Sequence, residues 1–428
     1  MKISAFQAVI LAIFGVSIVA GLVVLATAKS KNKGSGIPVV IWGTISSADF
    51  NNAVRDLTQG NNGLKMTYVE KRSEGFDQEL LETLAKGMGP DVILLSQDLI
   101  LRHGDKMAPI SYDRMPLRTF KDTFVQEGEL FLRAEGAIAI PFAIDPLVMY
   151  WNRDLLTNQG ISRPPVTWDE FLTLVPSLTQ KDKSQNIIRS GVSLGEFRNI
   201  VNAKEIIAAF FLQTGNSIVS PSSDGFGFAS TIAPVTLSAV GAINFYTDFA
   251  NPVKPNYSWN RALPNSRDLF AAGRLAFYFG FASESSKIRD KNPNLNFDLT
   301  FFPQPKGSAV AVTFGKMWGL SILKNSQNAA DALSHILAIT SVGPLSLWSE
   351  ATGLPPVRRD LLSASPADPY QSIFYDSAIR SRGWLDPNPA QSSIIFQNMI
   401  ESVTSGELES GKAIEAAGNE LGSSLQRL

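Results

Sequence analysis

Short apolar runs alternate with helical repeats along the chain from residue 38 onward. Val39-Val40-Ile41-Trp42 is typical of a buried strand, and residues 47–57 follow it with Phe50, Val54 and Leu57 on one helical face. Such alternation predicts an α/β fold with mainly parallel sheets. Further strands are expected at 64–69, 91–95, 138–140, 147–151, 275–279, 297–302 and 318–323. Further helices are expected at 76–84, 168–178, 268–273, 329–340, 391–404 and 410–427, with more helix within 200–250.

Turn and cap residues mark where several of these elements begin and end. Gly87 suits the end of the helix at 76–84, because glycine readily takes the left-handed conformation at a helix C-terminus. Pro141 and Pro146 bound the gap between two of the predicted strands. Thr167 and Glu170 have the spacing of a capping box, which predicts a helix start at this point.

The first 36 residues differ from the rest of the chain. Residues 5–28 carry no charge and are long enough to cross a hydrocarbon core about 30 Å thick, so we expect a transmembrane anchor. Cleaved leaders usually have apolar stretches of only about 7–15 residues, but Ala26-Thr27-Ala28 fits a cleavage pattern, and removal after Ala28 stays open. Residues 29–37 are polar and rich in Gly and Ser, as in a flexible linker. More lysines follow the apolar segment than precede it, which by the positive-inside rule favours a cytoplasmic body.

Length and composition fit a globular body of more than one domain. The chain has 428 residues, of which 44% are hydrophobic and 18% charged, and it exceeds one ordinary domain of roughly 100–200 residues. The net charge of −1 gives no reason to expect nucleic acid as a partner. The chain has no cysteine, which excludes disulfides, thiol nucleophiles and a lipid-modified cysteine anchor. With His103 and His335 as its only histidines, no metal site and no cofactor are expected.

Five short motifs follow one another along residues 38–428. They are Leu84-Ala85-Lys86-Gly87 with Gly89-Pro90-Asp91-Val92-Ile93; Ile140 to Asp145 with Tyr150 to Leu156; Pro164 to Phe171; Phe270 to Ala276; and Gly280 with Pro303. Each motif is common alone, but five in this order and in register resemble the family-1 extracellular solute-binding proteins.

The resemblance implies a two-lobe periplasmic-binding-protein fold of type II, preceded by the N-terminal transmembrane helix. The first lobe is then expected at 37–142 plus 304–343, and the second at 147–302 plus 346–428. Proline at each crossing between the lobes stiffens the flanks, so that closure is confined to a few neighbouring dihedrals. The crossings are expected near Pro141–Pro146, near Pro303 and near Ser341–Pro344.

The resemblance also implies a function. Proteins of this family capture a sugar or a similar small polar ligand between their lobes and present it to the permease subunits of an ABC importer. We therefore expect a body on the extracytoplasmic side of the cell membrane, against the positive-inside expectation. A membrane-anchored sensor that acts through a partner protein stays open, because the chain lacks a lipidated cysteine and carries a long apolar segment.

Ligand-binding residues are expected first at the carboxyl ends of parallel strands. Thr44 and Ser46 follow the first strand, Gln97 and Asp98 follow the third, and Asp145 lies at the first crossing. Carboxylates and amides pair with sugar hydroxyls, and by the resemblance both aspartates fall on sugar-binding positions. Asp98 could instead cap the helix that follows it.

Aromatic candidates are expected to supply faces for sugar rings. The family has a stacking tryptophan after its binding-loop glycine, but here Gly280 is followed by Phe281, and Trp384 could compensate. Each tryptophan also has a structural explanation, since an aromatic residue packs in a core more often than it stacks on a ligand. The candidates beyond the first lobe's strand ends are Phe281, Glu284, Trp318, Trp348 and Trp384.

Two enzyme hypotheses have weak support. Gly191-Val192-Ser193-Leu194-Gly195 matches a nucleophile elbow, but the only histidine downstream of Ser193 is His335, in the middle of a predicted helix. Asp98 and Asp145 could act as the paired acids of a glycosidase, but nothing in the sequence fixes the separation of their carboxylates. We therefore expect a binding protein and not an enzyme.

Overall fold

A computed structural model of the chain describes residues 38–59, 63–221, 228–232, 234–364 and 366–427. The expected anchor at 5–28, the cleavage site after Ala28 and the linker lie outside the described residues. Within the described ranges, no single helix is both long and apolar enough to cross a membrane. One bent pair of helices, Ala329–Ile339 with Val342–Thr352, passes the same length and composition test when taken together.

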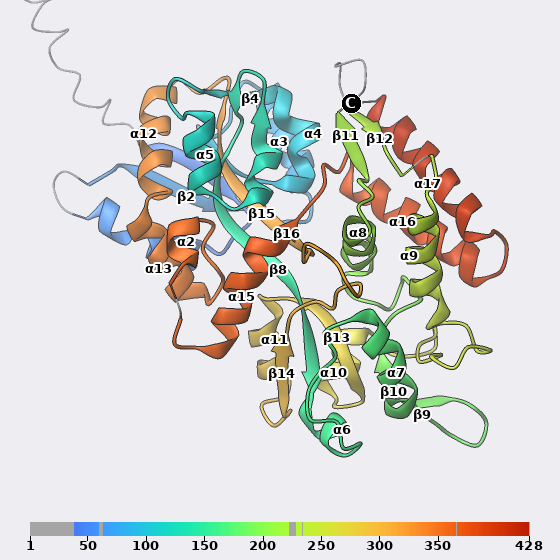
Figure 1. The fold of residues 1–428 in the computed structure, drawn as a ribbon. Coiled ribbons are helices and arrows are strands. Elements are labelled where there is room, and N and C mark those ends of the chain that lie inside the picture. The colour runs from blue at the N-terminus through green and yellow to red at the C-terminus, as the bar shows by residue number, and fades with distance from the viewer. Residues whose placement is uncertain (1–37, 60–62, 222–227, 233, 365, 428) are drawn as a thin grey trace, which may run out of the picture.

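A mixed sheet forms the centre of the first lobe, with parallel pairing at one side and antiparallel pairing around β15, and not the mainly parallel sheet that the sequence predicts (Figure 1). β1 (Val39–Gly43) lies between β2 (Met66–Glu70) and β3 (Val92–Ser96), and the three strands run parallel. β15 (Thr313–Leu323) pairs antiparallel with β3 on one side and with β8 (Ile140–Asn152) on the other. β3 is buried along almost its whole length, as expected for a strand covered on both faces.

Helices cover this sheet where the sequence periodicity predicts them. α2 (Ser47–Thr58) begins after Ser46, whose side-chain oxygen accepts a hydrogen bond from the backbone N–H of Asp49. α3 (Phe76–Ala85) ends before Gly87, which takes a positive φ of 68°. α12 (Ala329–Ile339) completes the cover of this sheet.

The second lobe is built on the strands that flank the other half of β8. β13 (Leu275–Phe281) pairs antiparallel with β8 and parallel with β10 (Ile187–Val192), and β14 (Phe297–Thr300) pairs with β8 at its other edge. β9 (Gln180–Lys181) extends the sheet beyond β10.

Trp168 anchors an aromatic core in this lobe. It opens α7 (Trp168–Leu178), and Thr167 caps that helix by accepting the backbone N–H of Glu170. The Glu170 carboxylate accepts the backbone N–H of Val166, one residue before the position that a capping box predicts. Trp168 packs at centroid distances of 4.8 to 5.7 Å on five aromatic rings, those of Phe171, Phe210, Phe245, Phe279 and Phe302.

β8 is one continuous strand that runs through both lobes, as Figure 1 shows. Its residues 140–146 pair with β15, and residues 147–152 pair with β13 and β14. The expectation of two strands with a break at Pro141–Pro146 is therefore wrong. Pro141 lies opposite Gly319 at a register shift of the ladder, and Pro146 lies where β8 changes partners. Proline is tolerated at such irregular positions because the regular ladder hydrogen bond is not required there.

The last crossing lies later than expected. α13 (Val342–Thr352) packs on α2, and α14 (Arg359–Leu362) lies on α5 (Leu117–Thr123), so both stay with the first lobe. The chain joins the second lobe after α14 and not at Ser341–Pro344. Pro344 lies in the first turn of α13, where the missing N–H does not interrupt the helix.

The remaining elements are short strands, single turns and helices of both lobes. α16 (Pro389–Thr404) and α17 (Ser410–Leu425) pack together, and α16 also lies against α8 (Ala203–Gln213). The others are η1 (Gln97–Leu99), α4 (Ile100–His103), η2 (Gly104–Lys106), β4 (Met107–Ala108), β5 (Ile110–Ser111), η3 (Gln126–Phe131), β6 (Leu132–Arg133), β7 (Gly136–Ala137), α6 (Arg153–Thr157), β11 (Val219–Pro221), β12 (Phe228–Ser230), α9 (Leu237–Asp248), α10 (Ser266–Ala271), α11 (Glu284–Lys291), α15 (Pro369–Arg380) and β16 (Ser381–Arg382).

Candidate ligand-binding cleft

Two cavities lie between segments of the two lobes. The first, of about 420 Å³, is lined by the ends of β1 and β3, by β15 and by residues 388–390; we call it the strand-end cleft. The second, of about 820 Å³, is lined by η3, β6 and α5 of the first lobe and by residues 217–219, Phe228 and 383–385; we call it the outer cavity. Both volumes fall in the usual range of small-molecule sites, about 300–1,000 Å³.

Three of the predicted site residues line the strand-end cleft together. Thr44 follows β1, Asp98 follows β3, and Trp318 on β15 lies opposite Ser96 in the antiparallel ladder. The neighbouring carboxyl ends of β1 and β3 bring the first two side chains together, as the strand-end argument predicts.

Asp98 has an unusual environment for an acid in a cleft. It is half-buried, and its carboxylate has no hydrogen bond or ion pair with any residue that the structure describes. Neither η1 nor α4 is capped by a side-chain hydrogen bond, so Asp98 is not the helix cap that was the alternative. An unpaired carboxylate facing a cleft can accept hydrogen bonds from ligand hydroxyls.

Lys316 lies at the floor of the same cleft and was missed by the sequence analysis. It is two residues from Trp318 on the same face of β15 and forms an ion pair with Glu205 of α8, at 3.2 Å. Burial alone would lower the pKa of Lys316, but the carboxylates of Glu205, Asp98 and Asp145 outweigh it, so that the pKa is raised. Lys316 therefore stays charged at neutral pH.

Two further polar groups of the cleft were also missed. Asp77 on α3 lines it and is held by Arg102 at 2.9 Å and by His103 at 2.5 Å. Asn388 lines the opposite side and precedes α16, whose first turn it caps by accepting the backbone N–H of Gln391. Asp77 and Asn388 come from segments without a strand-end signal, and only the fold brings them to the cleft.

Two of the predicted residues have structural roles instead. Ser46 caps α2. Gln97 is buried, and its side chain donates to the carbonyl oxygen of Gly315 and accepts from the backbone N–H of Met317. Gln97 thus holds the end of β3 against β15 rather than facing the strand-end cleft.

Asp145 lies behind the cleft, at the point where β8 passes between the lobes. It is 5% exposed and accepts a hydrogen bond from the backbone N–H of Ser283 at 3.1 Å. Lys316 is its cross-strand partner on β15. Burial raises the pKa of Asp145 to about 6, although the Ser283 N–H and the Lys316 ammonium act in the opposite direction. Asp145 joins β8 to the loop after β13 at this crossing.

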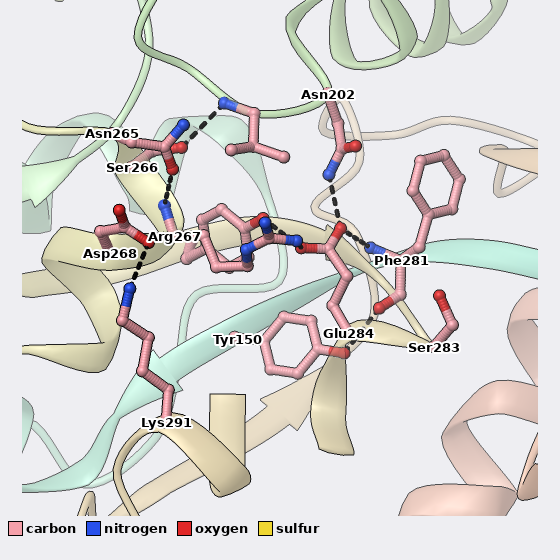
Figure 2. Close-up of polar contacts among 12 residues, drawn as sticks. Tyr150, Asn202, Asn265, Ser266, Arg267, Asp268, Phe281, Ser283, Glu284 and Lys291 are labelled. Carbon is pink, nitrogen blue, oxygen red and sulfur yellow. Dashed lines mark hydrogen bonds and ion pairs between the residues drawn. The ribbon is translucent and has the colours of Figure 1, made fainter. Parts of the chain in front are cut away.

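Glu284 and Phe281 belong to a closed hydrogen-bond network in the second lobe, shown in Figure 2. The Glu284 carboxylate accepts hydrogen bonds from the Asn202 side chain at 2.7 Å, from the Phe281 backbone N–H at 3.0 Å and from the Tyr278 hydroxyl at 2.5 Å. Arg267 approaches it at 3.4 Å. Glu284 is only 4% exposed, and these partners occupy its carboxylate oxygens inside the protein. Neither Glu284 nor Phe281 lines the strand-end cleft.

The other two predicted tryptophans are buried. Trp348 is 2% exposed and packs on Phe142 at a centroid distance of 5.0 Å, as in an ordinary core. Trp384 stacks on Phe396 at 5.9 Å and contributes to the outer cavity. Neither residue lines the strand-end cleft.

The enzyme hypotheses gain no geometric support. Ser193 is buried directly after β10 in the second lobe, whereas His335 lies in the first lobe, where its ring contacts the carbonyl oxygen of Lys65. Asp145 hydrogen-bonds to Ser283 and does not line the strand-end cleft with Asp98. Among the described residues, no group of three or more His, Asp or Glu side chains is placed to hold a metal ion.

Comparisons with known proteins agree with this architecture. The family model described as bacterial extracellular solute-binding protein matches residues 43–336. A solved cyclo/maltodextrin-binding protein, complexed with maltotetraose, superposes with a TM-score of 0.73 at 18% identity, covering 92% of this chain and all of that one. This likeness establishes the fold.

Two curated relatives match parts of the chain. A "probable ABC transporter-binding protein" of Deinococcus radiodurans is 29% identical over 213 residues, which are 46% of this chain and 47% of that protein. A diacetylchitobiose-binding protein of Streptomyces coelicolor is 24% identical over 247 residues, which are 57% of this chain and 54% of that protein. The matches thus span about half the length of each relative.

Proposed function

Because the chain belongs to the bacterial extracellular solute-binding proteins, we propose that it captures a sugar in the strand-end cleft and delivers it to an ABC importer. The related proteins that bind maltotetraose and diacetylchitobiose support a carbohydrate as the ligand class. Proposed contacts are Thr44, Asp98 and Trp318 from the first lobe and residues 388–390 from the second.

The observation that supports this proposal most strongly is that an unpaired carboxylate and an indole line the same cleft, which has a suitable size. Asp98 offers acceptor lone pairs for hydroxyls, and Trp318 offers an apolar face for the C–H side of a pyranose ring. Sugars carry both kinds of surface, so one ring can use both residues at once.

A thermal-shift assay on the full-length protein in mild detergent tests the proposal. The probes are maltotetraose, diacetylchitobiose and a panel of neutral mono- and disaccharides. A ligand that binds only the native state stabilises it by about 2.7 kcal/mol at a hundred times its Kd, so a true ligand raises the Tm with concentration. The absence of a shift with every sugar of the panel would contradict a carbohydrate ligand.

Location and partners form a second part of the proposal. We propose that residues 5–28 anchor the protein in the cell membrane, with the body outside the cytoplasm, where permease subunits of the importer receive the ligand. Protease added to intact spheroplasts is expected to digest the body. Protection of the body until the membrane is dissolved would contradict this orientation and restore the cytoplasmic alternative.

We also propose that the protein has no hydrolytic activity. Two observations support this view. Ser193 is buried, and it lies in a different lobe from His335 and far from it in the sequence. In an esterase assay, wild type and Ser193→Ala are expected to give the same background rate, and a rate that falls in the variant would contradict the proposal.

A further inference from the structure

Two lysine–carboxylate ion pairs lie around the strand-end cleft, in addition to the pairing of Asp77 with Arg102 and His103. Lys316 pairs with Glu205 at 3.2 Å, and Lys204, the residue before Glu205, pairs with Asp386 at 2.9 Å. Both pairs join groups that face the cleft region, because Lys316 lines the cleft and Lys204 also contacts the carbonyl oxygen of Pro389, another lining residue. Each ammonium in this region is therefore already neutralised by a carboxylate.

Two carboxylates remain without a cation of their own. Asp98 lines the cleft and has no ion pair with any described residue, and Asp145 accepts hydrogen bonds from Ser283 but has no ion pair among those residues. Both acids lie near enough to Lys316 to raise its pKa, after burial and Glu205 are taken into account. Asp98 also helps to raise the pKa of Asp386, an effect that burial dominates. The Asp98 carboxylate therefore acts electrostatically on both Lys316 and Asp386.

The Lys316 ammonium also contacts an aromatic ring. It lies 4.2 Å from the centroid of Phe281, within the range of a cation–π contact. With Glu205 and Phe281 on one side and two aspartates nearby, Lys316 has little positive field left for a bound anion. A carboxylate or phosphate of a ligand would instead lie close to Asp98 in a partly desolvated site, where like charges repel strongly.

We propose that the strand-end cleft selects uncharged, hydroxyl-rich ligands and rejects anionic sugars, with Asp98 as the residue that sets this selectivity. The inference rests on the proposed function and narrows its substrate class. A hydroxyl donates to Asp98 and accepts from a free N–H of Lys316, whereas a ligand carboxylate has no proton to donate. Sugar acids and sugar phosphates are therefore excluded by charge and not by size.

Matched probes of one ring size test this selectivity. Binding of D-glucose, D-glucuronate and D-glucosamine, and of the corresponding galactose series, is measured at pH 7.5 by ligand-observed NMR on the full-length protein. In each series the uronate is expected to bind at least ten-fold more weakly than the neutral sugar, which is about 1.4 kcal/mol. The amino sugar is expected to bind no more weakly than the neutral one, and raised salt is expected to narrow the gap for the uronate.

Variants locate the effect in the named residue. Asp98→Asn keeps the size of the side chain and is expected to reduce the discrimination against the uronate several-fold. The control is Asp56→Asn, at an exposed acid on α2, which is expected to keep the wild-type ratio. A uronate that binds wild type as well as the neutral sugar does, or a ratio unchanged in Asp98→Asn, overturns the selectivity while leaving the proposed function standing. If no sugar of either series binds, the selectivity as stated falls, and the proposed function falls with it only if no sugar of the thermal-shift panel binds either.

Discussion

Asp98 in the first lobe and Glu284 in the second differ in whether their carboxylates have hydrogen-bond partners. Each comes shortly after a core strand of its own lobe, β3 for Asp98 and β13 for Glu284, and each was a candidate ligand contact in the sequence. Glu284 is buried and has partners on Asn202, Tyr278 and Phe281, whereas Asp98 lines a cleft and has none among the described residues. An acid after a strand is therefore available to a ligand only where the fold leaves its lone pairs unused. An acid whose oxygens all have hydrogen-bond partners within the protein instead stabilises the fold around such a site.

The largest effect is expected on removing the satisfied acid. Glu284→Ala leaves the Tyr278 hydroxyl, the Asn202 amide and the Phe281 N–H without their acceptor in a buried place. Loss of such a buried charged partner typically reduces stability by about 3–5 kcal/mol. Urea unfolding monitored by fluorescence measures the change. A Glu284→Ala variant as stable as wild type would contradict a structural role for Glu284.

The reverse result is expected for the unpaired acid. Asp98→Ala removes no hydrogen bond or ion pair that the structure describes, so its free energy of unfolding is expected to stay within about 0.5 kcal/mol of wild type. Binding of the best neutral sugar is expected to weaken by about 1–3 kcal/mol, because a charge-assisted hydrogen bond is lost. Isothermal titration calorimetry gives the affinity, with the exposed Asp122→Ala as control. If Asp98→Ala is destabilised and its affinity is unchanged, Asp98 has a structural role like that of Glu284 and does not contact the ligand.

Asp145 is intermediate between these acids and gives a pH test. Burial raises its pKa from 3.8 to about 6, so the native state holds the proton more tightly than the unfolded chain does. Its contribution to stability is therefore complete below about pH 4 and is lost as the pH rises to about 6. Asp145→Asn keeps an acceptor for the Ser283 N–H, and at pH 7.5 it is expected to stabilise the protein by on the order of 1–2 kcal/mol.

Denaturant unfolding of wild type and Asp145→Asn at pH 4 and pH 7.5 measures this difference. Little difference is expected at pH 4, where the aspartate is protonated. Equal stability at both pH values would mean that Asp145 is not held in the buried environment described above.

The smallest effect is expected at Trp318, whose indole lines the same cleft as Asp98. Trp318→Ala is expected to weaken sugar binding by about 0.5–1.5 kcal/mol, the usual worth of an aromatic contact beyond its buried area. Trp318→Phe keeps an aromatic face and is expected to restore part of the affinity. If the two variants bind equally, the residue acts by packing and not by stacking on a ring.

The sequence predicted the framework well because local signals agree with the fold. The apolar runs that became β1 and β3 and the helix that begins at Trp168 all follow from periodicity and capping. The break predicted at the prolines of β8 is absent, because a strand that changes partners at Pro146 tolerates the missing N–H. The last crossing was placed too early for a related reason, since Pro344 lies in a first turn and interrupts nothing.

The site was only partly predictable. Thr44, Asp98 and Trp318 were found through strand-end and aromatic arguments, and they line one cleft. Lys316 and Asp77 were missed, since a lysine inside a strand and an acid in a first helical turn give no local sign of a cleft. Whether an acid such as Glu284 is satisfied depends on partners as distant along the chain as Asn202, which a single sequence does not reveal.

A crystal structure of the protein with the neutral sugar that raises its Tm most would show directly where the ligand binds. We expect a sugar ring over Trp318, with a hydroxyl within hydrogen-bond distance of the Asp98 carboxylate and residues 388–390 on its far side. A sugar bound in the outer cavity beside Trp384, with the strand-end cleft holding only solvent, would contradict this expectation.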